Sequence, residues 1–163
     1  MAVTAIGDVR VAANGKIIAG KTKIIDIRNA EIRADYIRKT SDIKGSHDYI
    51  EPRILAQFRV QNRPGHKFSY PAIDGTKTLP HSGVKTFVAH TPKRILIWSD
   101  GYAAPRIFTI KGLERTLNEI YKTDLHRCNK YPAVSALKDD RTAIQIDIDN
   151  WKRLDMEDVW SDS

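Results

Sequence analysis

Two apolar, strand-like runs that enclose one amphipathic segment limit the possible folds of this sequence more than any other feature. The runs are "RILIWS" at residues 94–99 and "TAIQIDI" at residues 142–148, and the second alternates apolar and polar side chains. Between them, residues 109–124 place Leu113 and Leu117 at helical spacing, after a threonine that can cap a helix. A strand, a helix and a strand in this order predict a sheet that is covered by a helix.

The N-terminal part predicts more strands and a short helix. Residues 2–6 read as a strand, and "VRVAANGKIIAG" reads as a hairpin that turns at Asn14-Gly15. Residues 22–27, "TKIIDI", predict a further strand. An amphipathic helix is expected over residues 29–40, with Asn29 as its N-cap.

The middle of the chain is richer in loops. A helix is predicted over residues 47–62, with Pro52 in its first turn, and a short strand near residues 68–73. Residues 84–90 and 94–99 predict strands that "TPK" joins into a tight hairpin, and "YPAVSAL" predicts a short helix. We expect one domain over residues 1–148, followed by an acidic C-terminal tail, residues 149–163.

The net charge of +7 is unevenly distributed, and a basic half suggests an anionic partner, but the dispersed charges fit a solvated face better. Residues 1–67 hold 13 basic and 7 acidic side chains, whereas the rest of the chain holds 14 and 13. The basic residues are dispersed among acidic ones, without zinc-finger spacing or an aromatic nucleic-acid signature, so we expect no nucleic acid partner. No apolar run approaches the roughly 20 residues that cross a bilayer, and the single cysteine, Cys128, fits a cytoplasmic setting.

Acidic residues stand at the ends of two predicted strands. Asp100-Gly101 follows residues 94–99, and Asp139 and Asp140 precede residues 142–148. If these strands are neighbours, the carboxylates can meet at one sheet edge, where they repel one another unless a cation lies between them. Oxygen ligands suit Mg²⁺ or Mn²⁺. The alternative is an ordinary turn after one strand and a solvated loop before the other.

Four short motifs occur in an order that resembles a known family. They are "IGDVRV", "VQNRPGHKFSYPAIDG", "LIWSDGY" and "DDRTAI", and they extend from about residue 6 to residue 148. This order is similar to the C-terminal half of a metal-dependent protein phosphatase of type 2C. The resemblance implies an α/β fold with helix–sheet–sheet–helix layers. It also implies hydrolysis of phosphoserine or phosphothreonine in a phosphoprotein, with Mg²⁺ or Mn²⁺ as cofactor.

The resemblance assigns roles to particular residues. It makes Asp100 and Asp139 metal ligands, with Gly101, Asp140 and Thr142 supporting them. It gives Asp8, in "IGDVRV", a structural role, and it leaves the catalytic residues unassigned.

The first half of the family pattern is absent, including the Asp-Gly pair that bridges two metals. Asp74-Gly75 occupies the wrong place in the order and is interpreted as a turn. Half of a stacked-sheet fold would leave strand edges and apolar faces uncovered. We therefore expect a partner chain that supplies the missing half, or self-association.

Two other functions remain open. The opening "VTAIGDVRVAANGKIIAGKT" also resembles N-terminal nucleophile hydrolases of the proteasome type, with Thr4 as nucleophile and Lys23 or Lys16 as basic helper. The third possibility is a non-enzymatic binding or assembly protein on a degenerate phosphatase-like fold.

Overall fold

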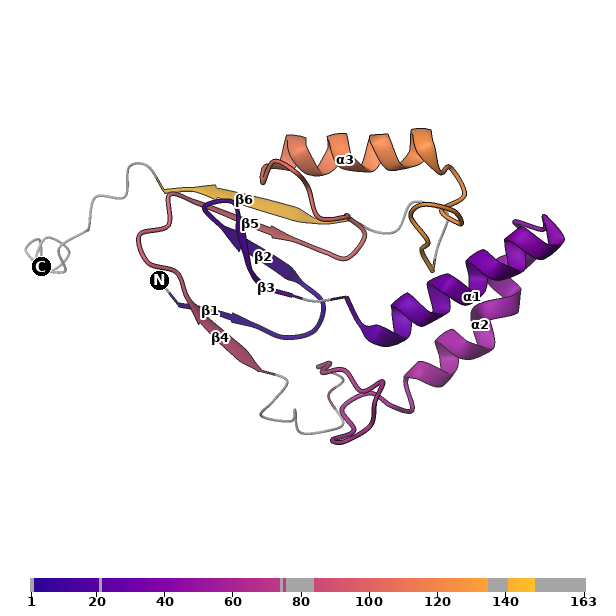
Figure 1. Ribbon diagram of the computed structural model, residues 1–163. Coiled ribbons are helices and arrows are strands. Elements are labelled where there is room, and N and C mark those ends of the chain that lie inside the picture. Colours follow the sequence, from indigo (N-terminus) through magenta and orange to yellow (C-terminus); the bar gives the residue numbers. More distant parts are fainter. Residues whose placement is uncertain (1, 21, 74, 76–83, 135–140, 149–163) are drawn as a thin grey trace, which may run out of the picture.

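The computed structural model describes residues 2–20, 22–73, 75, 84–134 and 141–148 (Figure 1). Within these residues it contains helices and strands in a mixed α+β arrangement. In chain order they are β1 (Ala2–Ala5), β2 (Arg10–Ala13), β3 (Lys16–Ala19), α1 (Ile24–Thr40), α2 (Gly45–Gln57), β4 (Lys85–Val88), β5 (Arg94–Trp98), α3 (Ile110–Thr123) and β6 (Ala143–Asp147).

The strands form two antiparallel sheets. The larger sheet has the order β3-β2-β5-β6, and the smaller sheet pairs β1 with β4. The predicted hairpin between residues 84–90 and 94–99 is therefore wrong, although both strands exist. After β4 the chain passes from the smaller sheet into the larger one, where β5 pairs with β2 and β6. Local sequence cannot distinguish this crossover from a hairpin, because both begin and end with similar apolar strands.

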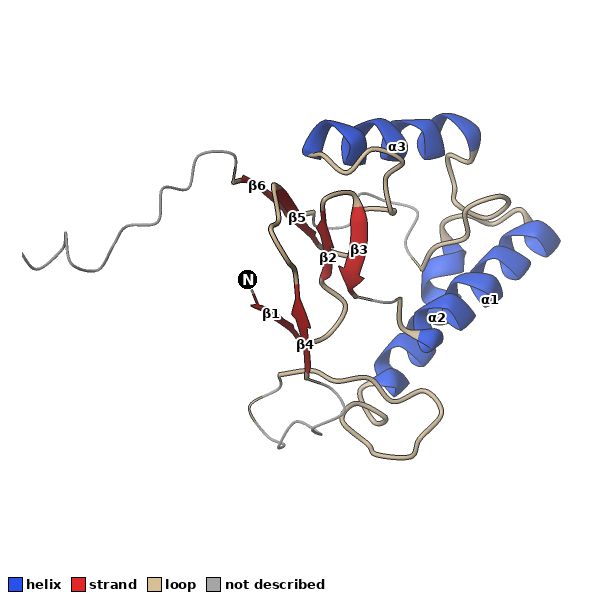
Figure 2. Cartoon of the chain, turned by 60° about the vertical axis from the view of Figure 1, so that its left-hand side comes forward, coloured by secondary structure: helices blue, strands red, loops and turns tan. Residues whose placement is uncertain are grey.

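The larger sheet has different partners on its two faces. On one face, Leu96 and Trp98 pack against Leu113 and Leu117 of α3. On the other face, the buried side chains of Val11, Ala19 and Ile95 pack against apolar residues of β1 and β4, including Val3 and Phe87. Figures 1 and 2 show α3 along one face of the larger sheet, while α1 and α2 lie beside the sheets. The predicted layers of helix, sheet and sheet are thus present, but α1 and α2 do not lie across the outer face of β1–β4.

Helix α1 replaces the strand predicted at residues 22–27. The helix begins at Ile24, and Asn29, the predicted N-cap, is a buried residue inside it. Asp26 lies in the first turn, where a carboxylate interacts favourably with the helix dipole. A short β-branched run is a weak strand signal, because strand propensity depends on the packing around it.

Helix α2 also differs from its prediction. It begins at Gly45, so Pro52 is an interior residue and not part of the first turn. Asp42 explains the earlier start, because its Oδ1 accepts a hydrogen bond of 2.8 Å from the backbone N–H of Gly45. Residues 68–73 are not a strand, and residues 131–134 of the predicted short helix are not helical; its remaining residues lie outside the described ones.

The sequence correctly predicted two local structures. Asn14 and Gly15 have φ values of 49° and 79°, as the two central residues of a type I′ hairpin turn require. Thr109 caps α3, because its hydroxyl accepts a hydrogen bond of 3.0 Å from the N–H of Gly112. Strand β6 also lies where the alternating run predicted it.

The loop after α3 is joined to α1 by a buried arginine. The guanidinium of Arg33 donates hydrogen bonds to the backbone carbonyls of His126, at 3.1 Å, and Ala133, at 3.2 Å. Because Arg33 is 2% exposed, these carbonyls replace the water that would otherwise solvate it. The contact fixes the position of α1, whose first turn contributes to the site described next.

Candidate metal centre

Three aspartates from different elements converge beside the larger sheet. Asp8 lies in the loop between β1 and β2, Asp26 in the first turn of α1, and Asp100 in the turn after β5. One carboxylate oxygen of each lies within 4.8 Å of the others. Asp8 and Asp26 are partly buried, and Asp100 is more exposed.

Strand register explains why Asp8 and Asp100 meet. In the antiparallel pair of β2 and β5, Arg10 is opposite Trp98. Asp8 precedes Arg10 by two residues and Asp100 follows Trp98 by two, so both lie just beyond the same end of this pair. A hydrogen bond of 3.2 Å from the Tyr102 N–H to the Ser99 carbonyl closes the turn that carries Asp100.

Lys23, the residue before α1, places its ammonium between two of these carboxylates. Its Nζ lies 2.8 Å from Oδ2 of Asp8 and 3.5 Å from Oδ2 of Asp26. The same atom lies 4.8 Å from the centre of the Tyr70 ring, within the range of a cation–π contact. One cation therefore pairs with two of the three carboxylates.

Arg10 holds the surrounding backbone in place. Its guanidinium donates to the carbonyl of Tyr102 at 3.1 Å and to the hydroxyl of Thr22 at 2.7 Å. These bonds connect β2 to the turn that carries Asp100 and to the segment before α1. The positive charge of Arg10 also interacts with Asp100 and Asp8.

The protonation of Asp8 and Lys23 is set mainly by burial and by their contact with each other. Burial acts to raise the pKa of Asp8, but the hydrogen bond and charge of Lys23 outweigh it, so this pKa lies below its ordinary value. Burial acts to lower the pKa of Lys23, but Asp8, Asp26 and Asp100 outweigh it and raise the pKa. Both effects favour a charged pair.

Asp100 and Asp26 have the opposite shift from Asp8. Burial and then the negative charge of Asp8 raise the pKa of Asp100 above its ordinary value, against the influence of Lys23. Burial likewise raises the pKa of Asp26, which Lys23 opposes. Burial is the first cause of both shifts, and the repulsion between Asp8 and Asp100 is one that a further cation would relieve.

The cluster brings oxygen donors for a divalent cation near one another. Around an octahedral Mg²⁺, opposite oxygens lie about 4 Å apart and adjacent ones roughly 3 Å apart, because each Mg–O distance is roughly 2.0–2.1 Å. The three carboxylate oxygens lie within 4.8 Å of one another and must move closer together to hold one ion, since three ligands cannot all be opposite. Carboxylate oxygens are also the donors that Mg²⁺ and Mn²⁺ prefer.

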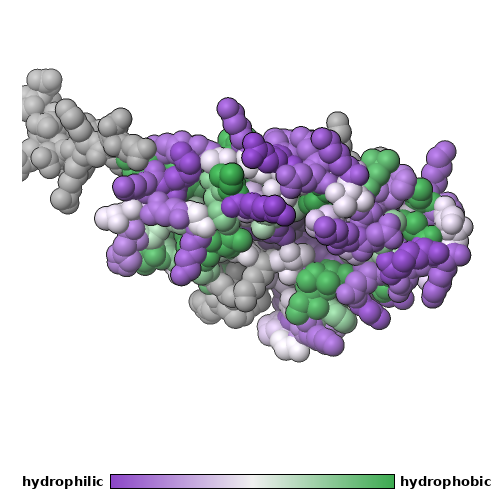
Figure 3. Space-filling view, turned by 45° about the horizontal axis from the view of Figure 1, so that its top comes forward, coloured by the Kyte–Doolittle hydropathy of each residue, from purple (hydrophilic) through white to green (hydrophobic). Residues whose placement is uncertain are grey.

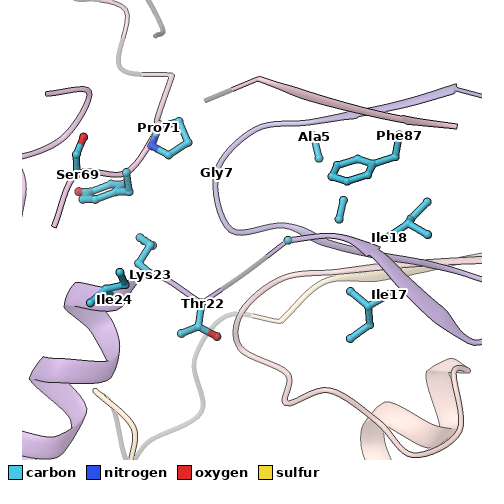
Figure 4. A pocket seen from close by; sticks show the side chains of 13 residues that line it. Ala5, Gly7, Ile17, Ile18, Thr22, Lys23, Ile24, Ser69, Pro71 and Phe87 are labelled. Atoms are coloured by element: carbon cyan, nitrogen blue, oxygen red, sulfur yellow. The ribbon is translucent and has the colours of Figure 1, made fainter. Parts of the chain in front are cut away.

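Two grooves open beside the cluster. The larger, of about 680 Å³, separates the hairpin β2–β3 and Phe87 from the segment that contains Ser69 and Pro71. Figure 4 shows Lys23, Ile24, Ser69 and Pro71 on one side of it and Ala5, Ile17, Ile18 and Phe87 on the other. A smaller groove, of about 270 Å³, is lined by Asp8 and Lys23 and by an apolar wall that includes Pro71 and Ile73. A ligand could therefore reach the cluster from solvent.

The structure places some of the predicted site residues at the cluster and does not describe others. Asp100 belongs to the cluster, and Gly101 is buried in its turn. Thr142 lies against this turn, since its N–H donates to Ser99 Oγ at 3.1 Å and its carbonyl accepts from the Ser99 N–H at 3.0 Å. Asp139 and Asp140 lie outside the described residues.

Sequence reasoning missed Asp8 and Asp26 as members of the cluster. The resemblance gives Asp8 a structural role, and the β-branched run around Asp26 predicts a strand. The pairing of β2 with β5 would have indicated Asp8, but this pairing joins segments far apart in the sequence. No local signal indicates Asp26, because its position depends on where α1 begins and how it packs.

The residues of the hydrolase alternative belong to different elements. The hydroxyl of Thr4, in β1, lies 3.1 Å from that of Thr86 in β4. Of its two candidate helpers, Lys23 is engaged with Asp8 and Asp26, and Lys16 is exposed on β3. Cys128 is a buried free thiol.

No protein-family model matches this sequence, and neither a curated protein nor a solved structure matches the chain. Within the described residues, no helix has the length and apolar character needed to cross a membrane.

Proposed function

We propose that this chain is a metal-dependent phosphatase-like domain in which Asp8, Asp26 and Asp100 hold one divalent cation, Mg²⁺ or Mn²⁺. The observation that carries the proposal is the convergence of three carboxylates within 4.8 Å. Two of them belong to "IGDVRV" and "LIWSDGY", the motifs that resemble the type 2C phosphatases.

The residues around the cluster have distinct roles in this proposal. Asp8 remains ionised, because Lys23 holds its pKa low against the effect of burial. Arg10 fixes the backbone turn of Asp100 by donating to the Tyr102 carbonyl. When bound, the cation would lower the pKa of a coordinated water and neutralise charge on a phosphate group. The reaction is hydrolysis of a phosphate monoester in a phosphoprotein, in the cytoplasm.

The domain is incomplete relative to the family that it resembles. A single cation held by one cluster provides only part of a site in which water is activated between metals. We propose that a partner chain, or a second copy of this chain, supplies the other ligands. Asp139 of "DDRTAI" remains a proposed ligand and Asp140 a proposed supporting residue of the same site.

One observation favours a second function, that of a non-enzymatic binding protein on the same fold. The ammonium of Lys23 already pairs with Asp8 and Asp26 at 2.8 and 3.5 Å. A cluster that carries its own cation can serve as a structural ion-pair network without binding a metal.

Calorimetric titration with Mn²⁺ tests the metal centre, and hydrolysis of p-nitrophenyl phosphate tests the reaction. Wild-type protein should bind Mn²⁺ weakly, and Asp100→Asn should weaken binding at least about tenfold, a loss of roughly 1.4 kcal/mol. Asp48→Asn is the matched control, because Asp48 is exposed on α2. The chain alone should hydrolyse little substrate.

Equal Mn²⁺ affinities for wild type and Asp100→Asn would refute the metal centre. Robust hydrolysis by the chain alone that Asp100→Ala leaves unchanged would refute the phosphatase mechanism. Loss of that activity in Thr4→Ala would favour the N-terminal nucleophile hydrolase instead.

A further inference from the structure

The cluster of Asp8, Asp26 and Asp100 already contains a positive group in a defined position. Among the described residues, Lys23 is the cation that forms ion pairs with these aspartates, at 2.8 Å to Asp8 and 3.5 Å to Asp26. The other nearby cation, Arg10, directs its hydrogen bonds to Tyr102 and Thr22. Lys23 therefore neutralises the cluster directly, whereas Arg10 acts on it from a neighbouring position.

The backbone holds Lys23 at this place. Lys23 is the N-cap residue of α1 in an extended conformation, with φ −61° and ψ 135°. Its carbonyl accepts hydrogen bonds from the N–H groups of Asp26, at 3.1 Å, and Ile27, at 3.2 Å. The helix start thus fixes the base of the side chain, and half-burial restricts its other end. This arrangement reduces the entropy that the side chain would lose on forming the ion pairs.

An ammonium in this position competes with a metal ion for the same oxygens. A lone pair of Asp8 Oδ2 that accepts from Nζ at 2.8 Å cannot coordinate a metal along the same direction. A divalent ion between the carboxylates would also lie close to a positive charge and be repelled by it. Binding therefore requires the ammonium to move.

The ammonium has one further contact besides the carboxylates. Nζ lies 4.8 Å from the centre of the Tyr70 ring, beside the groove that both residues line. Tyr70 itself is held by a hydrogen bond of 3.1 Å from its hydroxyl to Gln61 Oε1. This contact exists together with the ion pairs, so an ammonium that leaves the carboxylates can retain its contact with the ring.

We propose that Lys23 is the resident cation of the three-aspartate cluster and competes with divalent ions for it. The first part depends only on the ion pairs, and the second part rests on the proposed metal centre. Lys23 then sets the metal concentration at which the site is filled. It keeps the cluster folded when no metal is bound.

Three variants test this inference on the full chain. Lys23→Met removes the charge and keeps the length of the side chain, and Lys23→Arg keeps the charge. Lys16→Gln is the matched control, because Lys16 is an exposed lysine of β3. Mn²⁺ affinity is measured by calorimetry and the unfolding temperature in EDTA by circular dichroism.

Lys23→Met should bind Mn²⁺ at least about tenfold more tightly than wild type. In EDTA it should unfold at a lower temperature than Lys16→Gln, and Mn²⁺ should reverse this loss. Lys23→Arg should resemble wild type in both measurements. If Lys23→Met does not fold in EDTA, folding on addition of Mn²⁺ provides the same evidence.

The outcomes separate this inference from the proposed function. Equal Mn²⁺ affinity in wild type and Lys23→Met, lost in Asp100→Asn, would overturn the role of Lys23 and leave the metal centre intact. Binding by Lys23→Met but not by wild type would support the inference and refute a metal centre in the natural chain. Absence of binding in both would refute both. An unfolding temperature of Lys23→Met in EDTA equal to that of Lys16→Gln would also overturn the inference.

Discussion

At the scale of single residues, Asp124 is a buried carboxylate whose hydrogen-bond partners are backbone N–H groups. It is 3% exposed at the end of α3, and its oxygens accept hydrogen bonds from the N–H groups of Cys128 at 3.0 Å, Asn129 at 2.9 Å and Tyr131 at 3.0 Å. Burial acts to raise the pKa of Asp124, but these bonds outweigh it and lower the pKa below 3.8. The ionised side chain therefore orders the loop that Arg33 attaches to α1.

We expect Asp124→Asn to lower the free energy of unfolding by about 2 kcal/mol or more, because an amide group would face backbone donors. Glu119→Gln, at an exposed position of α3, is the control and should change it by less than about 0.5 kcal/mol. Urea unfolding at pH 7 measures both changes.

The difference in stability between wild type and Asp124→Asn depends on pH. The folded-state pKa of Asp124 is below its unfolded value, so its stabilisation is complete above the unfolded pKa and is lost as pH falls through the folded pKa. The difference between wild type and Asp124→Asn should therefore be constant near neutral pH and shrink below about pH 4. A difference that stays constant to pH 3 would contradict this role.

At the scale of elements, the start of α3 depends on close packing as well as on its cap. Gly112 is buried, and a Cβ at this position would lie 1.9 Å from the carbonyl oxygen of Ile107. Alanine favours a helix over glycine by up to about 1 kcal/mol, so helix propensity alone predicts that Gly112→Ala stabilises the protein. The clash with backbone predicts the opposite.

We expect Gly112→Ala to lower the free energy of unfolding by about 1–3 kcal/mol, because the Ile107 carbonyl cannot move without disturbing the turn before the helix. Asn118→Ala, at an exposed position of the same helix, should raise it by a few tenths of a kcal/mol. Thermal unfolding of the two variants distinguishes the effect of helix propensity from that of the backbone clash. A gain in both would mean that propensity outweighs the contact.

At the scale of the whole molecule, the two sheets differ in width. Ile144 and Ile146 of β6 pair with Ile97 and Ile95, which lie on the face that packs against the smaller sheet. Within the described part of the chain that sheet has two strands, and Ile144 and Ile146 are 52% and 39% exposed. In Figure 3 the side of the molecule that carries α3 is largely hydrophilic, with smaller apolar patches. The exposed isoleucines of β6 are candidates for contact with another chain.

We expect the protein to self-associate at micromolar concentration through this surface, because burying β-branched side chains there removes apolar area from water. The double variant Ile144→Ser/Ile146→Ser should shift the protein toward monomer in sedimentation velocity. Leu55→Ser, at a residue of α2 that is 60% exposed, is the control and should leave association unchanged. A wild type that stays monomeric over this range would refute the prediction.

The sequence by itself determined the structures that depend on neighbouring residues. The Asn14-Gly15 turn follows from the positive φ values that these two residue types tolerate. Helix α3 follows from its apolar spacing and from the hydroxyl of Thr109. The sequence also indicated Asp100 as a candidate ligand, because an acidic turn directly follows an apolar strand.

Tertiary structure decided what depends on segments far apart in the sequence. Residues 22–27 contain a β-branched run, yet packing and the first-turn Asp26 place Ile24–Ile27 in α1. Strands β4 and β5 belong to different sheets, although a short connection separates them. Asp8 and Asp100 meet because β2 pairs with β5, and Asp26 joins them because α1 begins beside that pair. Long-range pairing and packing select among conformations that are nearly equal in local energy, so no short stretch of sequence could reveal the cluster.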